Sequence, residues 1–264
     1  MNELIKPHAF MLDLDGTLYV GPHLMPDTVE FLRFLREHDI PHIFVTNNSS
    51  KSAAEYRDKL EKKGISVRED QVLTSGDSSI RYIKKHTDHH KIFLVGTPSL
   101  ENDFISSGFE LTENDPDCVI LGFDTGITYH KLEMAGHFLY QGLPYYATQP
   151  DITCITEKGL TPDTGVFIAG LEKMTGRLPV ILGKPSFPMV EAALELLGNT
   201  PSEKVAMVGD QLDTDITMGV TNNLISILVL SGETDEKKLQ NFNLTPDLVF
   251  RDIGGLLAHL RHVY

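Results

Sequence analysis

The chain has 264 residues, which allows one large α/β domain or two smaller ones. Its 23 Lys and Arg residues against 37 Asp and Glu residues give a net charge of −14, and such a surface repels nucleic acids and anionic membranes. Hydrophobic residues make up 41% of the chain and charged residues 23%, so we expect a packed core rather than disorder. A general role in binding nucleic acid or a membrane surface is therefore disfavoured.

The cysteines and the apolar runs indicate in which cellular compartment the protein is expected. Cys118 and Cys154 are far apart and fit neither a disulfide framework nor a paired-cysteine metal site. Aspartates interrupt the N-terminal stretch where a signal peptide needs an apolar run, and the apolar run 225–230 is far too short to span a bilayer. We therefore expect a cytoplasmic protein in a reducing environment.

Short apolar segments alternate with helical patterns along most of the chain. Strands are predicted at 9–14, 42–46, 72–74, 205–208, 225–230 and 248–250, and helices at 26–39, 52–63, 188–197 and 255–262. Several of these strands are continuously apolar, as expected of strands that are covered on both faces. The alternation predicts an α/β fold with a doubly wound, mostly parallel sheet of Rossmann-like type.

The middle of the chain carries a second series of such elements. Strands are predicted at 92–95, 119–121 and 145–147, and helices at 98–107, 130–141 and 164–175. Turn-rich segments flank this series at Ser75-Gly76-Asp77 and at 176–179. We therefore predict an inserted α/β domain at 78–179 between two core segments, 1–77 and 180–264, with hinges near Ser75-Gly76 and Gly183.

The first predicted strand runs into an acidic turn, Asp13-Leu14-Asp15-Gly16-Thr17. In a parallel sheet the carboxyl ends of the strands line the ligand crevice, and a period of two would place Asp13 and Asp15 on one side of an extended strand. Two carboxylates this close repel each other unless a cation or a proton lies between them, and Mg²⁺ prefers such oxygen ligands. A strand-end turn rich in aspartate, with no chemical role, is the alternative.

The second strand ends in Thr46-Asn47-Asn48-Ser49-Ser50, just before a predicted helix. Small polar side chains and free N–H groups at a helix N-terminus can hold an anion such as phosphate. The same residue types also serve as ordinary helix N-caps, so this motif alone does not decide between the two.

Two further motifs lie near the end of the chain. Lys184, in Gly-Lys-Pro-Ser before a helix, could place a positive charge on a phosphate, although a lone lysine is more often a solvated surface residue. A second acidic cluster follows the strand at 205–208, with Asp210 expected at the strand edge and Asp215 on the first turn of the next helix. Asp213 is expected on the surface. The acidic cluster does not match an EF-hand, because the required glycine and glutamate are missing.

The four motifs occur in the order DxDGT, TNN, GKP and GDxxxxD, each at the end of an element. With this pattern the sequence resembles the haloacid dehalogenase-like phosphatase superfamily, and within it the NagD-like (4-nitrophenylphosphatase-like) subfamily. The resemblance spans the whole chain, including the insert between TNN and GKP. It implies a Rossmann-like core with a mobile α/β cap, dependence on Mg²⁺, and an aspartyl-phosphate intermediate.

The resemblance also implies roles for the acidic residues. Asp13 would be the nucleophile, and Asp15 the general acid and base that serves the leaving oxygen and the attacking water. Asp13 and Asp210 would bind Mg²⁺ through their carboxylates, and Asp15 would bind it through its backbone carbonyl. Asp215 would lie behind them and orient Lys184 or a metal-bound water.

The same resemblance assigns the phosphate-binding residues. Thr46 and Asn47, with Asn48 adjacent, match the second motif, and Lys184 matches the lysine of the third. In the cap, 147–151 resembles the subfamily's ATNPD segment but has Gln149 in place of asparagine, and 162–165 also departs from its usual form. Tyr19, which follows the acidic turn, would either line the cleft or cover the core edge.

Several functions share parts of this pattern. A phosphomutase would keep the same core and return the phosphoryl group to its substrate. A receiver-type signalling protein also uses a strand-end aspartate, Mg²⁺, a threonine and a lysine, but it is typically half this length and has no cap. A haloacid dehalogenase would leave Asp210 and Asp215 unexplained, and a nicotinamide dehydrogenase lacks support because no GxGxxG follows the first strand.

The expected partner is a small phosphomonoester. Sugar phosphates, nucleoside monophosphates, phosphoglycolate-like acids and pyridoxal phosphate all remain open. No nucleic-acid or membrane partner is expected, and a homodimer formed through the cap is a further expectation, because caps of this subfamily are often dimerisation surfaces.

Overall fold

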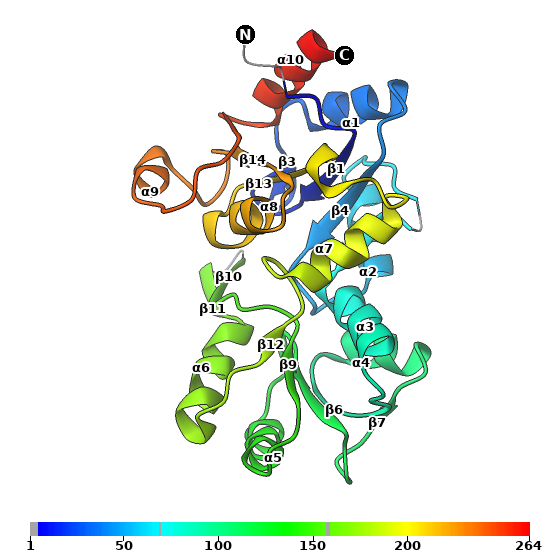
Figure 1. Ribbon diagram of the computed structural model, residues 1–264, viewed down its shortest axis with the longest axis vertical. Helices are drawn as coiled ribbons and strands as arrows, with labels where there is room; N and C mark the ends of the chain where they lie inside the picture. The colour runs from blue at the N-terminus through cyan, green and yellow to red at the C-terminus, as the bar shows by residue number, and fades with distance from the viewer. Residues whose placement is uncertain (1–4, 69, 157–158) are drawn as a thin grey trace. The chain divides into compact units, whose positions relative to one another are not determined.

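The computed structural model describes residues 5–68, 70–156 and 159–264 (Figure 1). The chain divides into two compact units. The first unit consists of Met1–Val45, Arg57–Leu73 and Ala193–Tyr264, and the second of Thr46–Tyr56 and Thr74–Ala192. Among the described residues, no helix combines the length and apolar character that a membrane span needs.

The first unit is built on a six-stranded sheet with the order β15-β14-β13-β1-β4-β5. The strands are β1 (Ala9–Asp13), β4 (His42–Thr46), β5 (Val72–Thr74), β13 (Val205–Gly209), β14 (Ile225–Val229) and β15 (Leu248–Phe250). β1 pairs in parallel with both β4 and β13, and β14 pairs in parallel with β13 and β15. All six strands predicted for the core are present.

Every residue of β1, β4 and β13 is buried, which explains their continuous apolar sequence. Helix α1 (Thr28–Glu37) buries Phe31, Leu32 and Leu35, and Phe31 packs edge-on against Phe10 of β1. Helix α10 (Ile253–Val263) packs against α1. This unit also contains the 3₁₀ turn Ser202–Lys204, the π-helix Leu212–Ile216, α8 (Thr217–Thr221) and α9 (Glu236–Gln240), while the division between the units falls within α2 (Ala53–Lys62) and α7 (Phe187–Leu196).

The second unit has a five-stranded sheet with the order β12-β9-β8-β6-β7, and its pairs are parallel. Its strands are β6 (Lys91–Val95), β7 (Glu110–Leu111), β8 (Cys118–Leu121), β9 (Tyr145–Ala147) and β12 (Val180–Ile181). Its helices are α3 (Ser75–His86), α4 (Pro98–Ser106), α5 (Tyr129–Tyr140) and α6 (Thr164–Thr175). An antiparallel hairpin, β10 (Thr153–Thr156) and β11 (Gly159–Pro162), precedes α6.

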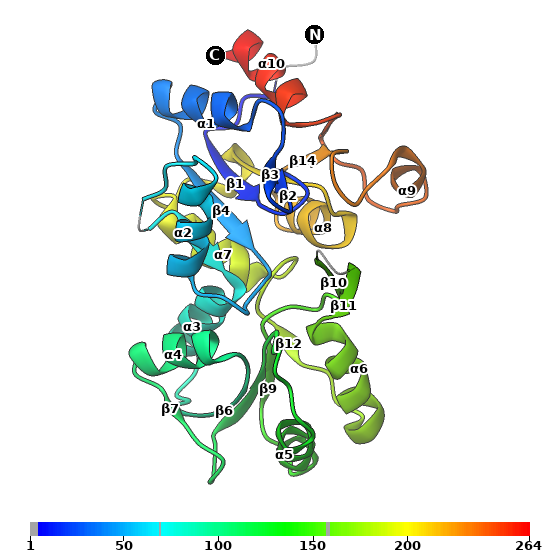
Figure 2. The same ribbon diagram turned by 180° about the vertical axis from the view of Figure 1, so that it is seen from behind.

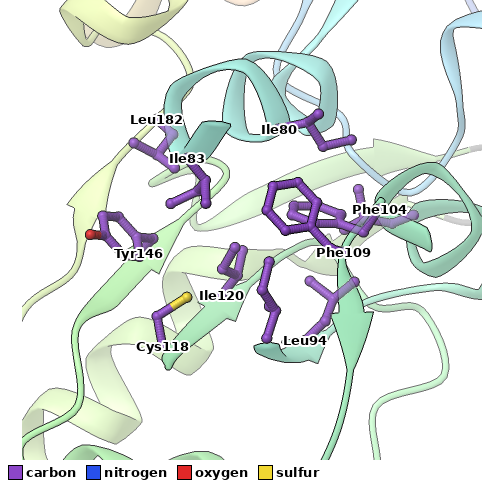
Figure 3. Close-up of a cluster of buried hydrophobic side chains, with 11 residues drawn as sticks. Ile80, Ile83, Leu94, Phe104, Phe109, Cys118, Ile120, Tyr146 and Leu182 are labelled. Atoms are coloured by element: carbon purple, nitrogen blue, oxygen red, sulfur yellow. The ribbon is translucent and has the colours of Figure 1, made fainter. Parts of the chain in front are cut away.

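Alternate residues of this second sheet face two separate cores. On β6, Ile92 and Leu94 pack with Ile83 of α3 and Phe104 of α4, in the cluster that Figure 3 shows. The intervening strand residues pack with α5 and α6 in the other cluster, which contains Phe93, Val95, Val119, Leu121, Phe138, Leu139, Ile168 and Leu171. This period of two means that helices cover both faces, and the predicted α/β fold with an inserted α/β region is confirmed.

One expectation about the second unit is wrong. Ser75-Gly76-Asp77, predicted as a turn, forms the first turn of α3. Thr74 caps this helix by accepting a hydrogen bond from the Asp77 N–H, and the Asp77 carboxylate accepts one from the Thr74 N–H. This capping box explains why residues typical of turns begin a helix here. The core and cap limits predicted from the sequence stay a prediction.

The sheet of the first unit determines where its polar strand ends lie. Asp13, the last residue of β1, is in register with Val45, which precedes Thr46 at the end of β4. On the other side of β1, Leu12 is in register with Val208, which precedes Gly209 and Asp210. Because these strands are parallel, their carboxyl ends meet at the same edge of the sheet.

Candidate active site

Three buried carboxylates gather at this edge of the first unit. Asp13 ends β1, Asp210 follows β13, and Asp215 lies in the π-helix after it. An oxygen atom from each of the three lies within 4.8 Å of the others, and the residues are 7%, 2% and 0% exposed. Buried anions this close repel strongly unless cations or protons offset their charge.

Neutral groups hold these carboxylates in place. The Thr17 hydroxyl lies 3.2 Å from Asp13 Oδ2 and 3.3 Å from Asp210 Oδ1. The Glu233 N–H donates to Asp210 Oδ2 at 2.6 Å, and the Gln211 N–H donates to Asp215 Oδ2 at 3.1 Å. These neutral donors orient the carboxylates, and a cluster of three carboxylates suits a hard divalent cation with oxygen ligands, such as Mg²⁺.

Glycines surround the cluster where no side chain would fit. A Cβ atom at Gly16 or at Gly232 would collide with the Asp210 carboxylate, and a Cβ at Gly209 would collide with that of Asp215. Gly16 also has φ = +92°, which residues with a Cβ rarely adopt. The turn predicted at Gly16 is therefore present, and it has a second purpose, which is to leave room for Asp210.

The structure places Asp215 with the other two carboxylates, whereas the sequence-based expectation put it behind them. The reason is the π-helix Leu212–Ile216, whose wider turn the sequence pattern did not reveal. Asp213, in the same π-helix, is exposed as expected. Asp215 therefore joins Asp13 and Asp210 as a candidate metal ligand.

Asp15 does not belong to this group of close carboxylate oxygens. Strand β1 ends at Asp13, and Asp15 forms an isolated bridge with Tyr19, across the turn in which the Gly16 N–H donates to the Tyr19 carbonyl. The regular strand therefore ends before Asp15, and the expectation that Asp13 and Asp15 lie on one side of the chain stays a prediction. Binding of Mg²⁺ by the Asp15 backbone carbonyl stays a prediction.

The Asp15 side chain has two partners of its own. The Tyr19 hydroxyl donates to Asp15 Oδ2 at 3.0 Å, and Lys59 Nζ lies 3.6 Å from the same oxygen. Desolvation by the surrounding protein raises the pKa of the Asp15 carboxyl, and the negative charge of Asp13 raises it further, while Lys59 and Tyr19 oppose this shift. A raised pKa favours the protonated form that a general acid needs.

Asn47 connects two segments of the second unit. Its Oδ1 accepts a hydrogen bond from the Lys184 N–H at 2.8 Å, which fixes the amide orientation because a backbone N–H can only donate. Its Nδ2 donates to the Lys184 carbonyl at 3.1 Å and to Asp151 Oδ2 at 3.0 Å. Both amide hydrogens of Asn47 are thereby used.

The other predicted phosphate-binding residues are either buried or held by hydrogen bonds within a turn. Lys184 is 3% exposed, so it is not a solvated surface residue. The Thr46 hydroxyl accepts a hydrogen bond from the Asn48 N–H at 3.2 Å, and Asn48 Oδ1 accepts from the N–H and the hydroxyl of Ser50. These contacts are turn contacts, and the Asn48 side chain serves as a cap for the residues after it.

Gln149 of the second unit, which stands where the resembling subfamily has asparagine, is buried beside α6. Its amide donates to Asp163, the N-cap of that helix, which also accepts hydrogen bonds from the N–H and the hydroxyl of Thr164. Burial raises the pKa of the Asp163 carboxyl, and these three hydrogen bonds oppose the shift. Asp163 is thus a helix cap, and Asp151 is the partner of Asn47.

Three residues of the site were not singled out from the sequence. Thr17 belongs to the DxDGT motif, so its position was a usable signal. Gly232 lies in a loop with no recognisable motif, and Lys59 lies among other lysines of an amphipathic helix. Nothing local distinguishes either residue, because their contacts with Asp210 and Asp15 join segments that are distant in the sequence.

Comparisons with known proteins agree with this site. A haloacid dehalogenase-like hydrolase family matches residues 10–110, and a HAD-hydrolase-like family matches residues 181–256. An acid sugar phosphatase of Staphylococcus aureus (strain USA300) is 33% identical over 253 residues, which cover 96% of this chain and 97% of that protein. The chain therefore belongs to the haloacid dehalogenase-like hydrolase family.

Similar solved structures indicate which members of this family the chain resembles. The 4-nitrophenylphosphatase of Thermotoga maritima has a TM-score of 0.93 at 41% identity, with 97% of this chain and 98% of that chain covered. NagD from Escherichia coli K-12 has a TM-score of 0.87 at 28% identity, with 94% and 97% covered. The predicted family, the NagD-like resemblance and the expectation of a phosphatase-type enzyme are thereby confirmed.

Proposed function

We propose that this protein hydrolyses small phosphomonoesters, sugar-phosphate-like or nucleotide-like, through an aspartyl-phosphate intermediate, with Mg²⁺ as its cofactor. The observation that carries the proposal is the buried group of Asp13, Asp210 and Asp215, with oxygens within 4.8 Å of one another. Relatives named acid sugar phosphatase and 4-nitrophenylphosphatase support the same chemistry.

In the first step Asp13 attacks phosphorus. A bond forms between an Asp13 carboxylate oxygen and phosphorus while the bond from phosphorus to the ester oxygen breaks, and Asp15 gives its proton to the leaving oxygen. In the second step water attacks phosphorus, Asp15 takes a proton from that water, and the bond from phosphorus to Asp13 breaks. Phosphate leaves, and both aspartates return to their starting states.

The other residues of the proposed site offset the repulsion between the negatively charged nucleophile and the negatively charged phosphate. Two unit negative charges about 4 Å apart repel by about 4 kcal/mol at an effective dielectric constant of about 20. Mg²⁺ held by Asp13, Asp210 and Asp215 would offset the repulsion between nucleophile and phosphate. Lys184 would supply a second positive charge, and the Thr46 side chain and the Asn47 N–H would donate hydrogen bonds to the phosphate oxygens.

A phosphate-release screen over a panel of phosphomonoesters tests the proposal. We expect turnover with Mg²⁺, loss of turnover with a chelator, recovery on addition of Mg²⁺, and no turnover by Asp13→Asn. Phosphate returned to another position of the substrate would instead identify a phosphomutase, and a stable phosphoenzyme that releases no phosphate would identify a signalling protein. Near-normal activity of Asp13→Asn, in a preparation checked for deamidation, would remove Asp13 as nucleophile.

The proposal also includes the cytoplasm as the compartment and a homodimer formed through the inserted domain. With two cysteines in 264 residues, the chain has the low cysteine content that is usual for proteins of a reducing compartment. Exposed apolar side chains on α5 and α6, Tyr129, Tyr140 and Met174 among them, support a contact surface there. Sedimentation of the purified protein at several concentrations tests the dimer.

A further inference from the structure

The contacts around Asp15 support an inference that rests on the proposed function and extends it. The Asp15 side chain is 57% exposed, so packing does not fix its rotamer. A general acid must hold its proton toward the leaving oxygen, and a misplacement of about 1 Å can cost about 100-fold in rate. Within residues 5–68, 70–156 and 159–264, the side chains that contact the Asp15 carboxylate are Tyr19 and Lys59.

Tyr19 is fixed in place more firmly than Asp15. It is fully buried, and it begins the short hairpin of β2 (Tyr19–Val20) and β3 (His23–Leu24), which Figure 2 shows directly after β1. Its backbone carbonyl accepts a hydrogen bond from the Gly16 N–H at 2.8 Å. Lys63 Nζ lies 4.7 Å from the centre of its ring and donates to the Gly21 carbonyl at 2.7 Å. The Tyr19 hydroxyl is therefore a stationary donor.

Lys59 determines in which direction that hydroxyl donates. Its Nζ donates to the Tyr19 oxygen at 2.8 Å, and an ammonium group can only donate. The single hydrogen of the Tyr19 hydroxyl is then directed to Asp15 Oδ2. One oxygen of Asp15 is thus held as an acceptor, and the proton of a protonated Asp15 belongs on the other oxygen, Oδ1.

We propose that Tyr19 and Lys59 are positioning residues for the general acid. They form a relay from Lys59 Nζ through the Tyr19 hydroxyl to Asp15 Oδ2, which holds the carboxyl in one orientation and leaves Oδ1 to deliver the proton to the leaving oxygen. The relay lies within one compact unit and uses no residue of the second unit.

Leaving-group dependence separates this role from a structural one. 4-Nitrophenyl phosphate and phenyl phosphate have nearly the same shape, but phenol is the weaker acid, so its departure depends more on protonation. The ratio kcat/KM reports the steps up to cleavage of the ester bond and leaves out hydrolysis of the phosphoenzyme. A defect in proton delivery therefore lowers kcat/KM more for phenyl phosphate than for 4-nitrophenyl phosphate.

The variants are Tyr19→Phe, which removes only the hydroxyl, and Lys59→Met, with Lys59→Arg as the conservative change and Lys62→Met as the control. Lys62 is exposed on the same helix. We expect Tyr19→Phe to lower kcat/KM about tenfold or more for phenyl phosphate and less than about threefold for 4-nitrophenyl phosphate. Lys59→Met should show a smaller difference between the two substrates in the same direction. Lys59→Arg should recover the wild-type kcat/KM for both substrates, and Lys62→Met should match the wild type.

Asp15→Asn serves as the reference, because it removes the acid itself. Suppose that Asp15→Asn lowers kcat/KM more for phenyl phosphate than for 4-nitrophenyl phosphate. If Tyr19→Phe and Lys59→Met then lower kcat/KM equally for the two esters, or leave it unchanged for both, the relay has no positioning role and the proposal is overturned. If Asp15→Asn itself shows no difference between the esters, the acid role in the proposed function fails and the relay proposal fails with it. A wild type that hydrolyses neither ester would refute the proposed function before the relay is tested.

Discussion

Gly16 lies so close to Asp210 that a Cβ atom on Gly16 would collide with the Asp210 carboxylate. The two residues follow neighbouring parallel strands, β1 and β13, and their contact joins the first acidic motif to the second. The glycine of DxDGT thus has a packing role in addition to its turn conformation. The position of Asp210 depends on the absence of a side chain at residue 16.

Gly16→Ala tests this contact. We expect kcat to fall at least about tenfold and activation to require more Mg²⁺, because Asp210 must move to make room for the methyl group. Gly21→Ala is the matched control, since Gly21 also has positive φ but nothing within 4 Å of where its Cβ would lie. Steady-state kinetics over a range of Mg²⁺ concentrations measure both variants. Equal losses in the two variants would mean that backbone strain, and not the collision with Asp210, limits activity.

Asp215→Asn tests whether Asp215 belongs to the metal site. Removing one of three mutually repelling carboxylates should raise the Tm of the metal-free protein, and it should weaken Mg²⁺ binding at least about tenfold. The increase in Tm caused by Mg²⁺ should therefore shrink, as linkage requires. Asp213→Asn, which changes an exposed carboxylate of the same π-helix, should leave both quantities unchanged. Thermal melts with and without Mg²⁺ give the comparison, and an unaltered Mg²⁺ response in Asp215→Asn would remove it from the site.

Asp103 on α4 provides a pH-dependent prediction. Burial, together with the neighbouring charges of Asp77 and Glu55, raises the pKa of its carboxyl from 3.8 to about 6. A carboxyl whose pKa is raised on folding favours the folded state when protonated, so stability is lost as the pH rises through about 6. The full shift corresponds to about 3 kcal/mol, and solvent screening of this half-buried group reduces the expected value to about 1 kcal/mol.

Asp103→Asn should therefore raise Tm by about 2–4 °C at pH 7.5. The difference from the wild type should shrink as the pH falls from about 6 toward 4, where the wild-type carboxyl becomes protonated. Asp88→Asn, which removes an exposed carboxylate of the same unit, is the control for net charge. Thermal melts at several pH values, from roughly 4.5 to roughly 7.5, measure the difference in Tm between the variant and the wild type. This range extends roughly one pH unit or more on either side of the titration of Asp103 near pH 6. A gain in Tm that is the same at every pH would contradict the prediction.

The sheets of both units were predictable because their strands are buried on both faces. Met11 and Met207 are fully buried in β1 and β13, as the continuous apolar runs indicated. Gly64 and Gly198 end helices with φ of +84° and +68°, which fits the C-terminal role of glycine. These features depend on local sequence, so composition and periodicity were sufficient to find them.

The features that the pattern did not show are local details of the backbone. Asp215 joins the carboxylate cluster because a π-helix turns it inward, and no periodicity marks a single π-turn. Regular pairing of β1 ends at Asp13, and Asp15 instead forms an isolated bridge with Tyr19 across the turn at Gly16. The identity of the motifs was therefore readable from the sequence, whereas the direction of each side chain was not.

The Asn47 amide provides the last prediction. It holds the Lys184 backbone through two hydrogen bonds and Asp151 through a third. In Asn47→Asp the new carboxylate can still accept from the Lys184 N–H, but it cannot donate to the Lys184 carbonyl, and it faces the Asp151 carboxylate at hydrogen-bond distance. We expect a loss of about 2–4 kcal/mol in stability and a fall in kcat, because Lys184 loses its fixed position.

A second change distinguishes this charge conflict from general damage. Asn47→Asp combined with Asp151→Asn restores a donor between the two side chains, so part of the stability and of kcat should return. The Asn48→Asp variant is the control, because Asn48 Oδ1 only accepts hydrogen bonds from Ser50 and an aspartate can do the same. Denaturant unfolding and phosphate-release kinetics on the single variants and the double variant measure the coupling. If the double variant is no better than Asn47→Asp alone, the contact with Asp151 does not restrain Asn47, and the position of Lys184 depends on other groups.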